Sequence, residues 1–177
     1  GNGLMISGYV DAYKSFNEDI FKNEAIEAAE FIYSNLIKRD GGLFHNHVNG
    51  KSKINGYLED YATIIQASLD LYEITLNQIW IERALELSEY VLDNFSGINS
   101  KLFYFTSKDD ENLISRSVEF RDNVIPSSNS IMAKNLFRLY HYFDRQEYYD
   151  IAKKMCLSVS EEFEANPSGY TLSLIHI

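Results

Sequence analysis

Apolar residues recur along the chain with the spacing of one face of an α-helix, and the same pattern occurs three times. It is anchored on Phe21, Trp80 and Tyr148, and apolar side chains follow each anchor at 4, 7, 11 and 15 residues. Offsets of this kind keep side chains on a single helical face. The pattern extends backward from each anchor to a tyrosine eight residues earlier, at Tyr13, Tyr72 and Tyr140. Each repeat is therefore long enough for two helices.

The repeats predict an all-α protein of three consecutive helical hairpins. The expected helices are residues 3–16 and 19–38, 58–75 and 78–95, and 129–143 and 146–164. Short polar turns join the two helices of each hairpin, which makes them antiparallel neighbours. Asn17, Asn77 and Asp144 lie in these turns and are suited to helix capping.

The connections between hairpins are much longer than the turns within them. They are residues 40–56, with four glycines, and residues 96–127, where apolar stretches such as 102–105 have the composition of short strands. Every long connection lies at the end of the molecule that carries the N-terminus of a hairpin's first helix. Because long loops in compact domains are usually functional, this rim is the predicted site.

Polar residues gather where the first helices begin. Aligning the repeats superposes Asn2, Tyr61 and Asn129, each near backbone N–H groups that lack a helical partner. Such a rim suits a polyhydroxylated or anionic ligand, whereas ordinary helix capping is the alternative for Ser127, Ser128 and Asn129. The predicted ligand-binding residues are Asn2, Tyr57, Glu59, Tyr61, Asn123, Ser127 and Asn129.

Two aspartates at the same rim are the candidate catalytic residues. Asp60 and Asp122 could form the pair of carboxylates that glycoside chemistry uses. A carboxylate at a helix N-terminus is expected to have a lowered pKa, which favours a base or a hydrogen-bond acceptor over a general acid.

Charge and composition exclude several other functions. The net charge of −10 disfavours nucleic acid and anionic membrane surfaces as partners, and no apolar run approaches the roughly 20 residues that span a bilayer. The single cysteine, Cys156, falls on an apolar helical face and is expected to be buried and inert; it fits a reducing, cytoplasmic compartment. His45 and His47 are interpreted as surface loop residues, because a metal needs more ligands. No cofactor motif occurs, so neither a metal nor a cofactor is expected.

The rim motifs also resemble a known family, the YyaL-like proteins, bacterial relatives of a spermatogenesis-associated thioredoxin-like protein. Residues 1–171 resemble the C-terminal part of that family, and the matching segments are Asn2-Gly3-Leu4-Met5-Ile6, Gly56-Tyr57-Leu58-Glu59-Asp60-Tyr61-Ala62 and Ile125-Pro126-Ser127-Ser128-Asn129-Ser130. Glu59 stands where the family commonly has Asp, and Ser128 where it commonly has Gly.

The resemblance implies a thioredoxin-like domain followed by an (α/α)6 toroid similar to six-hairpin glycosidases and sugar 2-epimerases. Residues 1–171 would then be the C-terminal half of that toroid, and its partner would be the missing N-terminal half. His45, His47 and His141 do not match the catalytic histidines of the epimerases. Residues 172–177 break the polar character of the preceding segment and are expected to be a non-native tail.

Three functional hypotheses follow. The first is a toroid that binds or processes a sugar at the rim, with glycosidase-like or sugar-isomerising activity of the full-length protein. The second is a non-catalytic scaffold that positions the thioredoxin-like domain or a partner. The third is that half a toroid has no activity of its own and self-associates through its open apolar flanks.

Overall fold

The hairpins predicted from the repeat are present in the structure. The computed structural model describes residues 2–45, 47–48, 51–52, 54–95 and 125–165. Their helices are α1 (Asn2–Phe16), α2 (Asp19–Asn35), α3 (Leu58–Thr75), α4 (Ile79–Asn94), α6 (Ile125–Phe143) and α7 (Gln146–Ala165), and two short strands, β1 (His47–Val48) and β2 (Lys51–Ser52), pair antiparallel between α2 and α3. The predicted all-α class is thus confirmed. Two predictions lie outside the described residues: the short strands at residues 102–105, and the boundary at residue 171 with the tail at 172–177.

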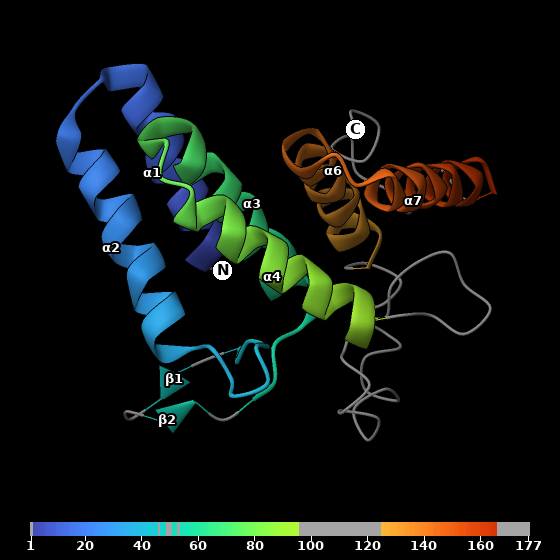
Figure 1. The fold of residues 1–177 in the computed structure, drawn as a ribbon, viewed down its shortest axis with the longest axis horizontal. Coiled ribbons are helices and arrows are strands. Elements are labelled where there is room, and N and C mark those ends of the chain that lie inside the picture. Colours follow the sequence, from blue (N-terminus) through green and yellow to red (C-terminus); the bar gives the residue numbers. More distant parts are fainter. Residues whose placement is uncertain (1, 46, 49–50, 53, 96–124, 166–177) are drawn as a thin grey trace.

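The six described helices form an inner and an outer row (Figure 1). The first helix of the middle hairpin, α3, packs against α1 on one side and α6 on the other, so the first helices form the inner row. The second helices, α2, α4 and α7, pack mainly against the first helix of their own hairpin. The inner helices begin at the end of the molecule where β1 and β2 lie (Figure 1). This arrangement places the loop between α2 and α3 at the same end as the inner-helix N-termini, as the repeat predicted. Most of the second long connection, residues 96–124, lies outside the described residues.

A left-handed residue ends the first helix of every hairpin. Asn17, Leu76 and Asp144 have φ angles of 53°, 55° and 52°, and each backbone N–H donates to the carbonyl of the tyrosine four residues earlier at 2.8 Å. Such a residue satisfies one of the carbonyls left open at a helix end. Leu76, not Asn77, therefore holds the equivalent position in the second turn. Asn77 instead lies in the turn before the N-cap of α4, Gln78, where its Oδ1 accepts the N–H of Ile79 at 3.1 Å.

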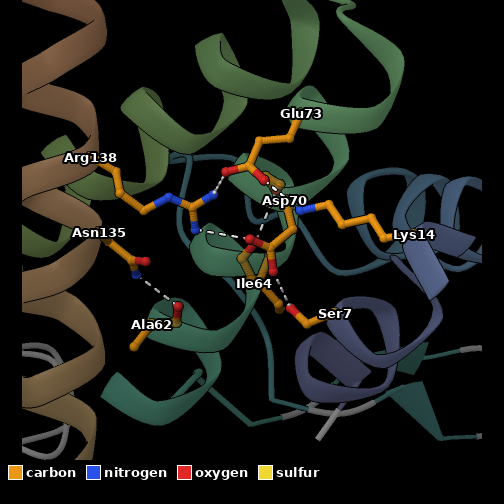
Figure 2. Close-up of polar contacts among 9 residues, drawn as sticks. Ser7, Lys14, Ala62, Ile64, Asp70, Glu73, Asn135 and Arg138 are labelled. Carbon is orange, nitrogen blue, oxygen red and sulfur yellow. Dashed lines mark hydrogen bonds and ion pairs between the residues drawn. The ribbon is translucent and has the colours of Figure 1, made fainter. Parts of the chain in front are cut away.

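A charged cluster joins the three inner helices (Figure 2). The Arg138 guanidinium of α6 contacts Asp70 at 2.9 Å and Glu73 at 2.8 Å, both on α3. From α1, Lys14 contacts Glu73 at 2.7 Å and Ser7 donates to Asp70 at 2.8 Å. Arg138 and Asp70 are largely buried, whereas Lys14 and Glu73 are exposed, so the Arg138–Asp70 contact is the part of the cluster that solvent screens least. The cluster connects α3 to both of its inner neighbours.

Two helix boundaries differ from the prediction. Helix α6 begins at Ile125, four residues before the expected start, because Pro126 is tolerated in a first helical turn where no N–H partner is needed. Ser127 and Asn129 therefore lie inside the helix and do not cap it. Helix α2 ends at Asn35, three residues early, where the chain turns into the loop that contains Gly42.

Both flanks of the described helices expose apolar side chains. They include Leu4 and Met5 on α1, Phe31 on α2, Phe137 on α6 and Leu157 on α7. Cys156 is half-buried rather than buried, and burial raises the pKa of its thiol. Among the described residues, none of the helices combines the length and apolarity that crossing a bilayer demands.

Candidate functional site

The site is built by the loop between α2 and α3, which folds back over the start of α3. Phe44 N–H donates to the Leu36 carbonyl at 2.8 Å, and His45 N–H donates to the Ile54 carbonyl at 2.7 Å. Gly56 N–H closes the loop by donating to the Leu43 carbonyl at 2.8 Å. These bonds hold the loop backbone in one conformation and place the His45 side chain beside the first turn of α3.

Tyr61 fastens this loop to the core. Its ring is buried, stacks on Tyr90 at 5.4 Å between ring centroids, and meets Phe95 edge-on at 5.1 Å. Its hydroxyl accepts the buried N–H of Leu43 at 2.7 Å. Gly42 packs against the hydroxyl of this tyrosine so closely that an added Cβ would lie 2.8 Å from it. Tyr61 thus lies beneath the rim as a loop anchor, with its polar atom already used.

Asp60 and His45 form a pair on top of this anchor. The Nδ1 atom of His45 lies 2.8 Å from Oδ2 of Asp60, and the same oxygen accepts the N–H of Tyr57 at 2.8 Å. The ring of Tyr57 lies 4.9 Å from the His45 ring, centroid to centroid, at an interplanar angle of 50°. Asp60 thereby caps the first turn of α3 and orients the histidine with one carboxylate oxygen.

Burial changes the expected acidity of Asp60. Loss of hydration raises the pKa of its carboxyl above the ordinary value, while the hydrogen bonds from His45 and the Tyr57 N–H act in the opposite direction. The expectation of a lowered pKa was wrong. A helix N-terminus contributes only about 0.3–1 kcal/mol to a nearby carboxylate, and desolvation of a carboxylate that is 16% exposed outweighs it.

A cavity of about 280 Å3 opens beside the pair. Its polar lining is His45, Glu59, Asp60, Thr63 and Asn2, and its apolar wall is Gly3, Leu36, Phe44 and Ile64. Asn2 comes from α1, His45 from the loop and Glu59 from α3, so the cavity lies where two inner helices begin. This volume is just below the range of about 300–1,000 Å3 that is usual for small-molecule sites.

The structure brings together some of the predicted site residues. Asn2, Glu59 and Asp60 line the cavity, and Tyr57 is half-buried at its edge against His45. On α6, Ser127 is half-buried and Asn129 is fully buried. Asp122 and Asn123 lie outside the described residues, so the predicted carboxylate pair and the assigned binding roles stay predictions.

His45 was expected from the sequence to be a surface loop residue and was assigned no role at the site. It lies 15 positions before Asp60, across a loop whose path no periodicity reveals. Among the described residues, no group of three or more histidine, cysteine, aspartate or glutamate side chains could hold a metal ion.

A second hollow, of about 620 Å3, lies between the outer helices α2 and α4. Asp40, Glu86, Glu89 and Asp93 line it, and its arginine, Arg83, is paired with Glu30 of α2. Asp40 already accepts the Tyr90 hydroxyl, and Glu89 is paired with Arg145, so these polar groups are engaged with the protein. The rim cavity is therefore the better candidate.

Comparisons with known proteins agree with the fold. No family model matches the chain. It is similar to an uncharacterised protein of Caenorhabditis elegans, with 31% identity over 93% of this chain and 23% of the relative, and to human spermatogenesis-associated protein 20, with 29% identity over 94% and 22%. The chain therefore spans less than a quarter of the length of these relatives.

Solved structures share the helical arrangement. A D-mannose isomerase superposes with a TM-score of 0.71 at 15% identity, over 93% of this chain and 40% of its own. A GH76 α-mannanase of Bacteroides thetaiotaomicron has a TM-score of 0.73 at 17% identity, over 91% and 43%. An unsaturated glucuronyl hydrolase specific for heparin has a TM-score of 0.68 at 18% identity, over 88% and 44%. The three hairpins thus share the helical arrangement of these (α/α)6 toroid folds over 40–44% of their length, and the chain has homologues named spermatogenesis-associated protein 20.

Proposed function

We propose that the rim cavity binds a neutral, hydroxylated small molecule of the sugar class. The observation that carries the proposal is the Asp60–His45 pair opening onto a polar cavity at the inner-helix N-termini. The proposal is also supported by the structural relatives, whose names describe proteins that act on mannose, mannan or heparin. The fold likeness alone would be a weak argument for function, so the lining has to carry the ligand class.

The lining favours hydroxyl groups over charged ligands. Glu59 and Asp60 supply carboxylate acceptors, and Asn2 supplies both a donor and an acceptor. Phe44 offers a ring edge or face for the apolar side of a sugar ring. An anionic ligand would meet two carboxylates in a chain of net charge −10, and the N-terminus of α3 already has Asp60 as its anion. The small volume suits one sugar ring rather than an oligosaccharide.

Ligand-observed NMR tests this proposal on the folded chain. Neutral hexoses, with mannose first, are titrated against the native protein and the Glu59→Gln variant. Glu24→Gln is the matched control, because Glu24 is an exposed glutamate on α2 away from the cavity. We expect Glu59→Gln to weaken binding about tenfold, the lower end of the effect of losing a hydrogen bond to a charged group, and Glu24→Gln to leave it unchanged.

Two results would contradict the proposal. One is that no neutral sugar binds at about 10 mM, which corresponds to less than about 2.7 kcal/mol of binding free energy. The other is that both glutamate variants behave alike. A folded chain without sugar binding would leave the non-catalytic scaffold as the better hypothesis.

A further inference from the structure

His45 is held so that its two ring nitrogens have different surroundings. Nδ1 faces Asp60 at 2.8 Å, and the ring packs against Tyr57. The Asp60 oxygen that it contacts already receives the N–H of Tyr57, so that oxygen acts as an acceptor. An ionised Asp60 then requires the proton of a neutral His45 to be on Nδ1. Nε2 is left with its lone pair, on a side chain that is 42% exposed and lines the cavity.

We propose that His45 is the proton-transferring group of the rim cavity and that Asp60 is its positioning residue. This assignment rests on the proposed function of the cavity, and it differs from the sequence prediction, in which Asp60 itself acted on the ligand. Asp60 is the more buried partner of the pair, at 16% exposure, and its contacting oxygen is already used twice. The exposed histidine is the partner that a ligand can reach.

The proton transfer balances without any further reactant. The Nε2 lone pair takes the proton of a ligand hydroxyl, so the Nε2–H bond forms while the O–H bond breaks and its electron pair stays on the ligand oxygen as an alkoxide. The resulting imidazolium keeps its Nδ1–H bond to Asp60, whose negative charge stabilises it. Return of the proton from Nε2 to the ligand restores the neutral ring. Asp60 holds the tautomer and the ring orientation throughout, as a carboxylate does behind many functional histidines.

The other groups around His45 do not replace Asp60 in this role. Glu59 lies on the adjoining position of α3 and is exposed at the cavity, and Asn2 of α1 is neutral. On the loop, the ammonium group of Lys38 lies over the Phe44 ring at 6.0 Å and is paired with Asp40 at 3.8 Å. Asp60 is thus the carboxylate in hydrogen-bond contact with the imidazole.

Acylation of histidine by diethyl pyrocarbonate tests the assignment without a known ligand. The reagent reacts with the unprotonated ring nitrogen, so a carboxylate that holds the proton on Nδ1 makes Nε2 the reactive atom. Rates are measured at neutral pH on the full chain by mass spectrometry of peptides containing His45 and His141. His141 is the internal control, since it is exposed on α6 and its ring contacts Phe137 at 4.7 Å and Tyr140 at 5.2 Å.

We expect His45 to react about fivefold faster than His141, in keeping with a charge-assisted hydrogen bond. Asp60→Asn keeps an oxygen that can accept both hydrogen bonds but removes the charge. It should lower the His45 rate to that of His141 without changing the His141 rate. A purely structural contact predicts equal rates for His45 in the native protein and in the variant.

Equal rates for the two histidines in the native protein would overturn the assignment, even if the variant does not fold. An unchanged His45 rate in folded Asp60→Asn would also overturn it. The outcomes are separable from those of the sugar titration. Fast acylation of His45 without sugar binding would contradict the proposed ligand class and support the His45–Asp60 assignment. Sugar binding with slow acylation would support the cavity as the binding site and contradict proton transfer by His45.

Discussion

Removing the hydroxyl of Tyr61 should destabilise the protein and loosen the loop that holds His45. The hydroxyl accepts the N–H of Leu43 at 2.7 Å, in a place from which water is excluded. Tyr61→Phe keeps the ring stacked on Tyr90 and the edge contact with Phe95. It leaves the Leu43 N–H buried without an acceptor. The substitution therefore removes the polar contacts of the Tyr61 hydroxyl, with Leu43 and with Tyr90, and keeps the ring packing.

The expected loss follows from that orphaned donor. A buried N–H without a partner costs about 1–3 kcal/mol, more than the net value of the bond itself. For a chain of this size, a loss of about 2 kcal/mol lowers the melting temperature by about 4–8 °C. Tyr142→Phe is the matched control, because the Tyr142 side chain is 40% exposed; it should change stability by no more than about 0.5 kcal/mol.

Urea denaturation followed by circular dichroism measures both variants at the same protein concentration. Amide hydrogen exchange at residues 43–45 reports the loop separately, and we expect faster exchange there in Tyr61→Phe. If Tyr61→Phe is as stable as Tyr142→Phe and its loop exchanges at the native rate, Tyr61 does not anchor the site.

Three further predictions concern the inner helices, the pH response and the flanks. Gly3→Ala should lower the free energy of unfolding by about 1–3 kcal/mol in urea denaturation, because its Cβ would lie 2.5 Å from the Thr63 carbonyl carbon. Gly8→Ala has open space around it and should stabilise helix α1 by about 0.5–1 kcal/mol. Because burial raises the pKa of Asp60 in the folded state, its contribution to stability is complete below the unfolded value near 3.8 and is lost as pH rises through the folded value. The pKa of Glu73 is lowered, so its effect on stability has the opposite pH dependence: the contribution is present above about pH 4.5 and is lost as pH falls. The stability–pH curves of Asp60→Asn and Glu73→Gln should therefore diverge from the native curve in opposite directions. The isolated chain should also self-associate through its exposed apolar flanks, and a monodisperse monomer in sedimentation velocity would contradict this.

The helices could be predicted because they repeat. A column such as Tyr13, Tyr72 and Tyr140 recurs at one place in each hairpin, and the apolar face that follows it has helical spacing. The boundaries were less predictable where local rules compete. The predicted connection, residues 96–127, included Pro126, yet this residue lies within the first turn of α6.

The site was only partly predictable, because residues that align in the repeat occupy different positions in their helices. Asn2 is the first residue of α1, whereas Tyr61 is the fourth of α3 and Asn129 the fifth of α6. The last two consequently turn into the core, and Asn2 remains at the cavity. The contact of His45 with Asp60 depends on the folded path of the loop, which is set by its bonds to the core and leaves no periodic trace in the sequence.

A map of amide chemical shifts on adding a neutral hexose to the labelled chain tests the central claim most directly. The account predicts saturable shifts at His45, Glu59 and Thr63, at the rim cavity, and none at Arg83 and Asp93 in the hollow between the outer helices. Shifts confined to that outer hollow, or no shifts with about 10 mM sugar, would contradict the claim that the inner-helix rim is the functional end of the molecule.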